Sequence, residues 1–308
     1  MTYPLAYPLA WLNPTDSTCK SPDLVQLAAT TSSALMSYSM RAPLRAGRAA
    51  AGRCRKRLSE RDLAVLTSLR RFRYMTALQI EELHFFEHTT RLTAARTCRR
   101  VLERMTRVGL IWRLERRIGG IRAGSASFVY ALAPFGQRII DPDGEARLRY
   151  AEPSDVFLEH TLAIAQLAVD LHRLSRTTDD VDLIAVDPEP ECWRRFTVGL
   201  EGVQILKPDL SVSLRVGEYD YHWFVEVDLS THSAATVVRK CRLYHSYWQR
   251  GVEQDRSGLF PRILVVAPSQ RRASLIERSI RNARNLNLDL FALTTSDDAL
   301  KWLTGEAS

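Results

Sequence analysis

Helical periodicity predicts three consecutive helices in the first half of the chain. In LSERDLAVLTSLRRF, residues 58–72, leucines recur at helical spacing, and Ser59 stands where an N-cap is expected. A second, shorter helix matches residues 76–85. The third begins near Thr90 and ends at Gly109, because glycine is common just past the C-terminus of a helix.

The third predicted helix has an apolar side and a basic side. At about 100° per residue, its apolar residues share one face: Ala94, Cys98, Val101, Leu102, Met105 and Val108. Its arginines gather roughly opposite: Arg96, Arg100, Arg104 and Arg107. We therefore expect the apolar face to pack on a core and the arginines to face solvent.

Two strands joined by a basic, glycine-rich tip follow, in residues 110–134. Three helices and then a hairpin is the order of a winged helix-turn-helix, whose third helix enters the major groove while the wing contacts phosphate or the minor groove. The candidate DNA-binding residues are Thr93, Arg96, Thr97, Arg100, Arg104 and Arg107 on the helix, and Arg116, Arg117 and Arg122 on the wing. A small helical domain used for protein contact or dimerisation is the alternative.

The second half of the chain alternates between helical and strand patterns. Helices are predicted at 154–176, 233–251, 270–284 and 296–303, and strands at 181–191, 204–215, 221–230, 261–269 and 288–295. This order predicts a mixed α/β domain, with a sheet flanked by helices.

One predicted hairpin, in residues 207–230, carries three carboxylates. If Gly217 and Glu218 form its two-residue loop, Asp209 lies directly opposite Glu226, and Asp228 shares their face through the strand period of two. The other face of the second strand is apolar and belongs to the core.

Opposed carboxylates destabilise a hairpin unless a cation compensates them. Carboxylate oxygens are the ligands that Mg²⁺ prefers, so we expect Asp209 and Glu226, assisted by Asp228, to hold Mg²⁺ or Mn²⁺. An exposed acidic hairpin face without a metal is the alternative.

Composition indicates a globular protein and the compartment in which it resides. At 308 residues and 45% hydrophobic content, the chain can bury a full core. Its five cysteines form no CxxC pair, which argues against a disulfide framework or a structural zinc site. No apolar run is long enough to cross a bilayer, and the N-terminus lacks the pattern of a signal peptide. We expect a cytoplasmic protein without a membrane contact.

Charge divides the chain into three parts. Residues 1–57 carry 8 Lys/Arg against 2 Asp/Glu, residues 58–140 carry 15 against 7, and residues 141–308 carry 20 against 26. Basic charge concentrated in one region is typical of polyanion binding. We predict a flexible basic arm over 1–57, a winged helix-turn-helix over 58–145 and an α/β domain over 146–308.

The α/β part resembles the PD-(D/E)xK nuclease fold over roughly residues 150–295. PD at 208–209 and EVD at 226–228 match its motif, except that Asp228 stands where the fold has lysine. The resemblance implies that Asp209 and Glu226 bind Mg²⁺ and that a lysine positions water, a role that Lys240 can take over. It also implies a further acid on the preceding helix, Glu159 beside His160, and a Tyr four residues after Lys240, which is Tyr244.

The whole arrangement resembles the replication-relaxation family of bacterial plasmids and integrative elements, over about residues 60–295. The resemblance implies a role in plasmid replication and DNA relaxation by nicking. We expect double-stranded DNA, a second copy of the chain in a homodimer, and other replication or conjugation proteins as partners. A different class stays open: a non-catalytic regulator or replication initiator whose degenerate nuclease fold serves dimerisation or partner docking. A purely protein-binding module is a third alternative.

Overall fold

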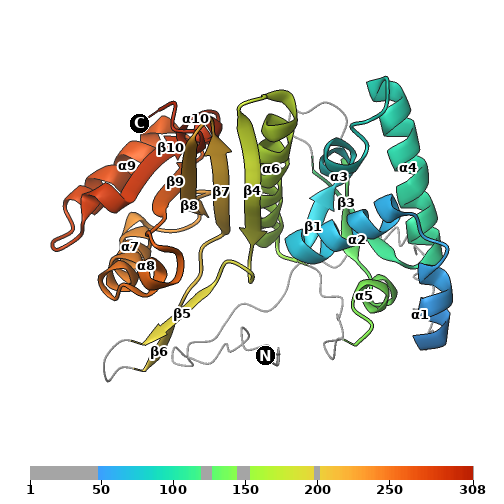
Figure 1. Ribbon diagram of the computed structural model, residues 1–308, viewed down its shortest axis with the longest axis horizontal. Coiled ribbons are helices and arrows are strands. Elements are labelled where there is room, and N and C mark those ends of the chain that lie inside the picture. Colours follow the sequence, from blue (N-terminus) through green and yellow to red (C-terminus); the bar gives the residue numbers. More distant parts are fainter. Residues whose placement is uncertain (1–47, 119–126, 144–152, 198–201, 308) are drawn as a thin grey trace, which may run out of the picture. The chain divides into compact units, whose positions relative to one another are not determined.

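The computed structural model describes residues 48–118, 127–143, 153–197 and 202–307, without the side chains of residues 48 and 115–118. Its first half is a winged helix-turn-helix (Figure 1). Its elements are α1 (Arg48–Arg55), α2 (Glu60–Phe72), β1 (Tyr74–Thr76), α3 (Ala77–His84), α4 (Arg91–Val108), β2 (Ile111–Ile118), β3 (Ser127–Leu132) and α5 (Pro134–Ile140). The strands form an antiparallel sheet in the order β1-β3-β2.

Local capping explains where these helices begin and end. Ser59 and Asp62 form a capping box at the start of α2, and Thr76 and Gln79 form one at the start of α3. Helix α4 ends at Gly109, whose φ of 79° is the left-handed conformation that glycine adopts without strain. The predicted starts of the three helices and the predicted end of α4 are therefore confirmed, each by a specific cap.

The second half is built on a mixed five-stranded sheet in the order β10-β9-β8-β7-β4. The elements are α6 (Asp155–Thr177), β4 (Val181–Pro188), β5 (Arg194–Thr197), β6 (Val203–Leu206), β7 (Leu210–Val216), β8 (Tyr219–Val227), α7 (Ala234–Gln249), α8 (Val252–Ser257), β9 (Arg262–Ala267), α9 (Gln270–Arg281), β10 (Phe291–Thr295) and α10 (Ala299–Leu303). Strands β8, β9 and β10 are parallel, whereas β7 is antiparallel to β8 and β4. The predicted α/β sheet is confirmed.

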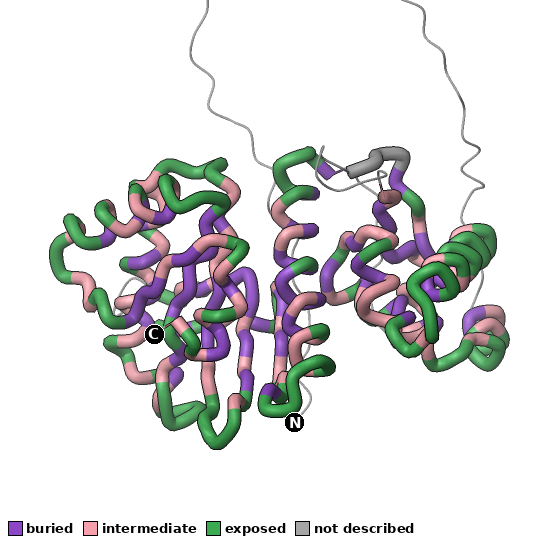
Figure 2. The backbone as a smooth tube through the Cα atoms, turned by 90° about the horizontal axis from the view of Figure 1, so that it is seen from above, coloured by how far each residue is buried: buried purple, intermediate pink, exposed green. Residues whose placement is uncertain are grey.

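Both faces of this sheet are covered. Trp223 and Val225 of β8 pack into the cluster that includes α6 and α10, whereas Phe224 packs into the cluster that includes α7 and α9. Buried residues concentrate along the strands and on the inner sides of the helices (Figure 2). The sheet is therefore the middle layer of three.

The described residues belong to one compact unit, and its two halves share contacts. The Arg71 side chain of α2 donates to the Val186 carbonyl at 2.6 Å and forms ion pairs with Asp187 and Glu191. The Gln79 amide donates to the Leu162 carbonyl of α6 at 2.9 Å. Residues 144–152 are not described, so the predicted domain boundary near residue 145 stays a prediction.

The structure departs from the sequence-based expectations at several points. The end of the predicted arm, 48–55, is helical and packs on α5, where Arg55 donates to the Ile139 carbonyl at 2.6 Å. The expected strand 204–215 is split at Pro208, which lacks the N–H that a ladder needs, and β6 pairs with β5 instead. Helices α5 and α8 and strands β1 and β5 were not expected. Val108, placed on the apolar face, is 39% exposed.

None of the described helices is long and apolar enough to span a bilayer. The longest, α6, has 23 residues, but it carries charged side chains along its length.

Candidate functional site

The outer face of α4 carries most of the residues predicted to contact DNA. Its exposed members are Thr93, Arg96, Arg100, Arg104 and Arg107, and Thr97 is half-buried. Arg91 and Arg99 are exposed on the same helix and were missing from the sequence-based list. Leu92, at its N-terminal end, is 71% exposed. The face opposite the core therefore combines positive charge with one exposed apolar side chain.

One of these arginines already has an internal partner. Arg104 forms an ion pair at 2.5 Å with Asp62, which is buried and accepts a hydrogen bond from the Ser59 N–H in the α2 capping box. Arg107 pairs loosely with Glu103 of its own helix, at 3.5 Å. On the wing, Arg122 and the side chains of Arg116 and Arg117 lie outside the described residues.

The hairpin register places two of the acids together. Leu210 pairs with Val225 and Val216 with Tyr219, so the loop consists of Gly217 and the following residue, as predicted. The Asp209 N–H donates to the Val225 carbonyl at 3.0 Å, which extends the ladder by one step. Asp209 therefore lies opposite Glu226, at the carboxyl end of β8.

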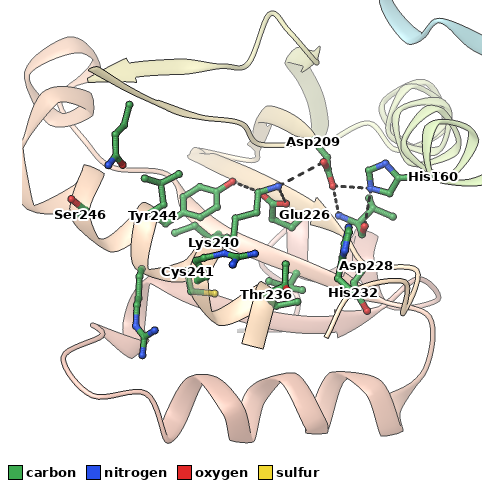
Figure 3. Close-up of a pocket in the computed structure, with 18 residues that line it drawn as sticks. His160, Asp209, Glu226, Asp228, His232, Thr236, Lys240, Cys241, Tyr244 and Ser246 are labelled. Atoms are coloured by element: carbon green, nitrogen blue, oxygen red, sulfur yellow. Dashed lines mark hydrogen bonds and ion pairs between the residues drawn. The ribbon is translucent and has the colours of Figure 1, made fainter. Parts of the chain in front are cut away.

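Helix α7 brings a lysine and a tyrosine to these acids (Figure 3). The Lys240 ammonium and the Tyr244 hydroxyl both donate to the Glu226 carboxylate, and the ammonium lies 3.9 Å from an oxygen of Asp209. Because Lys240 and Tyr244 are one helical turn apart, they share the side of α7 that faces the sheet. The structure brings these four predicted residues into one cluster.

Burial and charge set the ionisation of this cluster. Burial raises the pKa of Glu226 to about 7, against the opposing effect of the Lys240 ammonium. Burial also acts on Asp209, but Lys240 and His160 outweigh it and hold its pKa below the usual value. For Lys240, the carboxylates of Glu226 and Asp209 outweigh burial and raise the pKa, so the side chain stays charged.

His160 of α6 approaches the cluster from the other side, whereas its neighbour does not. The His160 Nε2 lies 3.0 Å from the Val227 carbonyl and 3.3 Å from the Asp209 carboxylate. Both neighbours are acceptors, so this nitrogen carries a proton. Burial lowers the pKa of His160, but Asp209 raises it by more. Glu159 is exposed and lies outside the pocket around these residues.

The third predicted acid, Asp228, has a different partner. Arg272 at the start of α9 holds its carboxylate through two hydrogen bonds, of 2.7 and 3.0 Å, and also donates to the His232 carbonyl at 2.6 Å. Both side chains are largely buried, at 12% and 6% exposure. The structure therefore pairs Asp228 with a cation of its own instead of adding it to the cluster.

The cluster lies in a pocket of about 680 Å³ between the sheet and α7. Two pocket residues that sequence analysis missed are Arg239 and Arg242, on α7. Glu189, which follows β4, joins Asp209 and His160 around a second, much smaller cavity, and burial raises its pKa. Arg239 and Arg242 flank Lys240 in the sequence, whereas no local motif marks Glu189, which the fold brings to the acids from a distant position.

The donor set fits a small divalent cation in part. Mg²⁺ needs only one or two protein carboxylates, since waters and substrate phosphates complete its shell. Asp209 and Glu226 supply two oxygen-bearing groups on neighbouring strands, and they are the residues that would hold it. In the structure Lys240 contacts both of these carboxylates. Among the described residues, no group of three or more His, Cys, Asp and Glu is placed to hold a metal.

Fold and site together define a class of protein. It combines a winged helix-turn-helix that exposes arginines on its third helix with an α/β domain that holds a buried carboxylate–lysine cluster at the end of a hairpin. The chain belongs to the replication-relaxation family, whose pattern it matches over residues 66–263. The match includes the third helix, the hairpin and the Lys240–Tyr244 turn, and it assigns a role in replication and relaxation. Comparisons with curated proteins and with solved structures found no match.

Proposed function

We propose that this chain is a DNA-binding replication protein of a plasmid or integrative element that nicks a phosphodiester bond in the α7 pocket. The observation that carries the proposal is the convergence of Asp209, Glu226 and Lys240 from two strands and a helix. Bringing buried acids of like charge together costs free energy. A bound cation would offset their repulsion and place a phosphate beside them.

The front half supplies the duplex-binding surface of this proposal. Exposed arginines on α4 match the winged helix-turn-helix, in which the third helix enters the major groove. Arg96 and Arg100 are the best placed, because they are exposed and form no ion pair or hydrogen bond with another described residue. Arg104 would contribute less, because it already pairs with Asp62.

Each residue of the cluster has a role that follows from its contacts. Lys240 stays charged and offsets the negative charge of a phosphate beside it. Glu226 accepts hydrogen bonds from Lys240 and Tyr244, which fix its carboxylate beside Asp209. Mg²⁺ held by Asp209 and Glu226 would supply Lewis acidity at the phosphate.

Direct hydrolysis fits this site better than a covalent tyrosine intermediate. The Tyr244 hydroxyl is buried and donates to Glu226. Burial, followed by the charge of Glu226, raises its pKa well above the usual value, so the phenolate nucleophile would be scarce. Tyr244 therefore positions the carboxylate.

Conversion of supercoiled plasmid to open circle in the presence of Mg²⁺ tests the proposal. We expect the wild type to nick, and Asp209→Asn and Glu226→Gln each to lose roughly 100-fold or more in rate. Asp255→Asn, an exposed carboxylate on α8, is the matched control and should nick like the wild type. Absence of nicking by the wild type with Mg²⁺ and Mn²⁺ would exclude the proposal.

The non-catalytic alternative has one specific observation in its favour. Lys240 already compensates Glu226 and Asp209, and Arg272 compensates Asp228, so the acids are satisfied without a metal. In that case the winged helix would bind an operator or origin and the α/β domain would dock a partner or a second copy. Tight duplex binding without cleavage under several metals would identify this function.

A further inference from the structure

Two arginines of α7 line the pocket without contributing to the cluster. Arg239 and Arg242 are exposed, and both belong to the lining of the pocket that contains Lys240 and Glu226. At helical spacing, Arg239, Arg242 and Ser246 form a stripe on the outer side of α7, turned away from its buried residues Val238, Cys241 and Tyr244. Because all three also line the pocket, the stripe marks its solvent-facing rim.

Unlike the cations that contact the acids, these two are not matched to an acid. Lys240 contacts Glu226, and Arg272 holds Asp228. Arg239 and Arg242 form no ion pair or hydrogen bond with another residue in the part of the chain that the structure describes. Their charge is available in a region, residues 141–308, that carries 20 basic against 26 acidic residues.

The acids of the pocket oppose the approach of an anionic strand. Asp209, and Glu226 when ionised, repel a phosphate that enters the pocket, and Lys240 offsets only part of this. Exposed guanidinium groups at the mouth would bind the flanking phosphates and lower that repulsion, since Arg matches phosphate geometry with paired donors.

The size of the pocket limits what can enter. About 680 Å³ lies within the range of small-ligand sites, roughly 300–1,000 Å³. That is room for one or two nucleotides of a strand but not for the width of a duplex.

We propose that Arg239 and Arg242 bind the backbone phosphates of a single nucleic-acid strand and position it over Lys240 and Glu226. This inference rests on the proposed function for the chemistry at Glu226, but the strand-binding site itself does not require cleavage. It gives the chain two nucleic-acid surfaces of different class: α4 for duplex and the α7 stripe for a separated strand.

The test is the binding of a fluorescein-labelled single-stranded oligonucleotide to the full chain, by anisotropy, in EDTA and at several salt concentrations. Each phosphate contact on a single strand adds about 0.7 to the slope of log K against log salt. We expect the double variant Arg239→Ala/Arg242→Ala to lose about 1.4 of that slope, which corresponds to about 20-fold in affinity at about 0.1 M salt. Arg239→Lys/Arg242→Lys should retain most of the slope, because it keeps the charge.

Two comparisons make the outcome decisive. Arg250→Ala removes an exposed arginine at the end of α7 outside the pocket and should change neither slope nor affinity by more than about twofold. The affinity of the double variant for duplex should stay at the wild-type value. An unchanged single-strand slope, or an equal loss for duplex, would overturn the assignment. Because EDTA prevents cleavage, this result is separate from the nicking assay.

Discussion

Two histidines, one in each half of the chain, have pKa values shifted in opposite directions. His84 in α3 shares a hydrogen bond of 2.9 Å with Ser68, and burial lowers its pKa to about 4, helped by His172, Arg61 and Arg176. The pKa of His160 in α6 is instead raised, because Asp209 outweighs burial. The same side chain is thus held neutral in one half and favoured as a cation in the other.

The two histidines differ in the balance between burial and nearby charge. For His84 burial is the main cause of the lowered pKa, and the neighbouring cations His172, Arg61 and Arg176 act in the same direction. The environment of His160 is anionic, as expected for a pocket that attracts a cation or a protonated base. The proposed binding of phosphate in this pocket therefore depends on the positive charge of Arg239 and Arg242 in addition to Lys240.

The largest expected effect on stability comes from removing the cation that compensates Asp228 in the second half of the chain. Arg272→Met leaves Asp228 buried without its cation and should lower the free energy of unfolding by about 3 kcal/mol. Arg272→Met/Asp228→Asn should recover part of this loss. Denaturant unfolding measures both, and Arg215→Met, from an exposed pair with Asp220, is the control that should leave the midpoint unchanged. An equal shift for the two single variants would contradict the account.

A smaller effect is the pH dependence that His84 gives to the free energy of unfolding. A histidine whose folded pKa is depressed contributes stability that is present above the unfolded pKa, about 6.5, and lost as pH falls toward 4. Between pH 7 and pH 5 this loss is roughly 1 to 2 kcal/mol. His84→Gln should remove it, since Gln can still bond Ser68 without titrating. If unfolding curves of the variant keep the full pH dependence of the wild type, the neutral buried histidine is not its source.

Around the pocket in the second half, the free energy of unfolding depends on pH in the opposite direction. A group whose folded pKa is raised, such as His160, contributes stability that is fully present below the unfolded pKa and is lost as pH rises through the folded pKa. Mild acid should therefore weaken the surroundings of α3 while it strengthens those of the pocket. Hydrogen exchange at pH 5 and pH 7, read separately for α3 and for the end of β8, measures the contrast. Parallel changes in the two regions would contradict it.

The smallest expected effect separates two arginines of α4. Arg104→Gln should cost about 1 kcal/mol in stability because it leaves Asp62 without its ion pair, and it should barely change the salt dependence of duplex binding. Arg96→Gln should leave stability unchanged and reduce the salt slope by about 1. Duplex titrations at several salt concentrations distinguish them, and the reverse assignment would remove Arg96 from the binding surface.

Much of the fold was predictable because its determinants are local. Ser59, Thr90 and Gly109 mark helix ends through caps that involve only a few neighbouring residues. The loop at Gly217 fixes the hairpin register and with it the pairing of Asp209 with Glu226. The period of α7 then places Lys240 and Tyr244 on one face.

The remainder depends on contacts between distant segments. Arg272 reaches Asp228 across 44 positions, and only the parallel pairing of β8 with β9 brings α9 to that edge of the sheet. Asp228 has the right strand period for the cluster, yet its partner decides its role. Arg104 likewise matches the basic face of its helix, but it pairs with the N-terminal cap of α2. Periodicity identifies the face of a residue, whereas its partner comes from the tertiary fold.

The most direct test of the central claim is the additivity of the two carboxylates in nicking. Rates of open-circle formation with Mg²⁺ are measured for the wild type, Asp209→Asn, Glu226→Gln and the double variant. If the two residues act as one site, each single variant loses roughly 100-fold or more and the double variant loses little beyond either. Losses that multiply, or a single variant that nicks like the wild type, would contradict a shared site at the end of the hairpin.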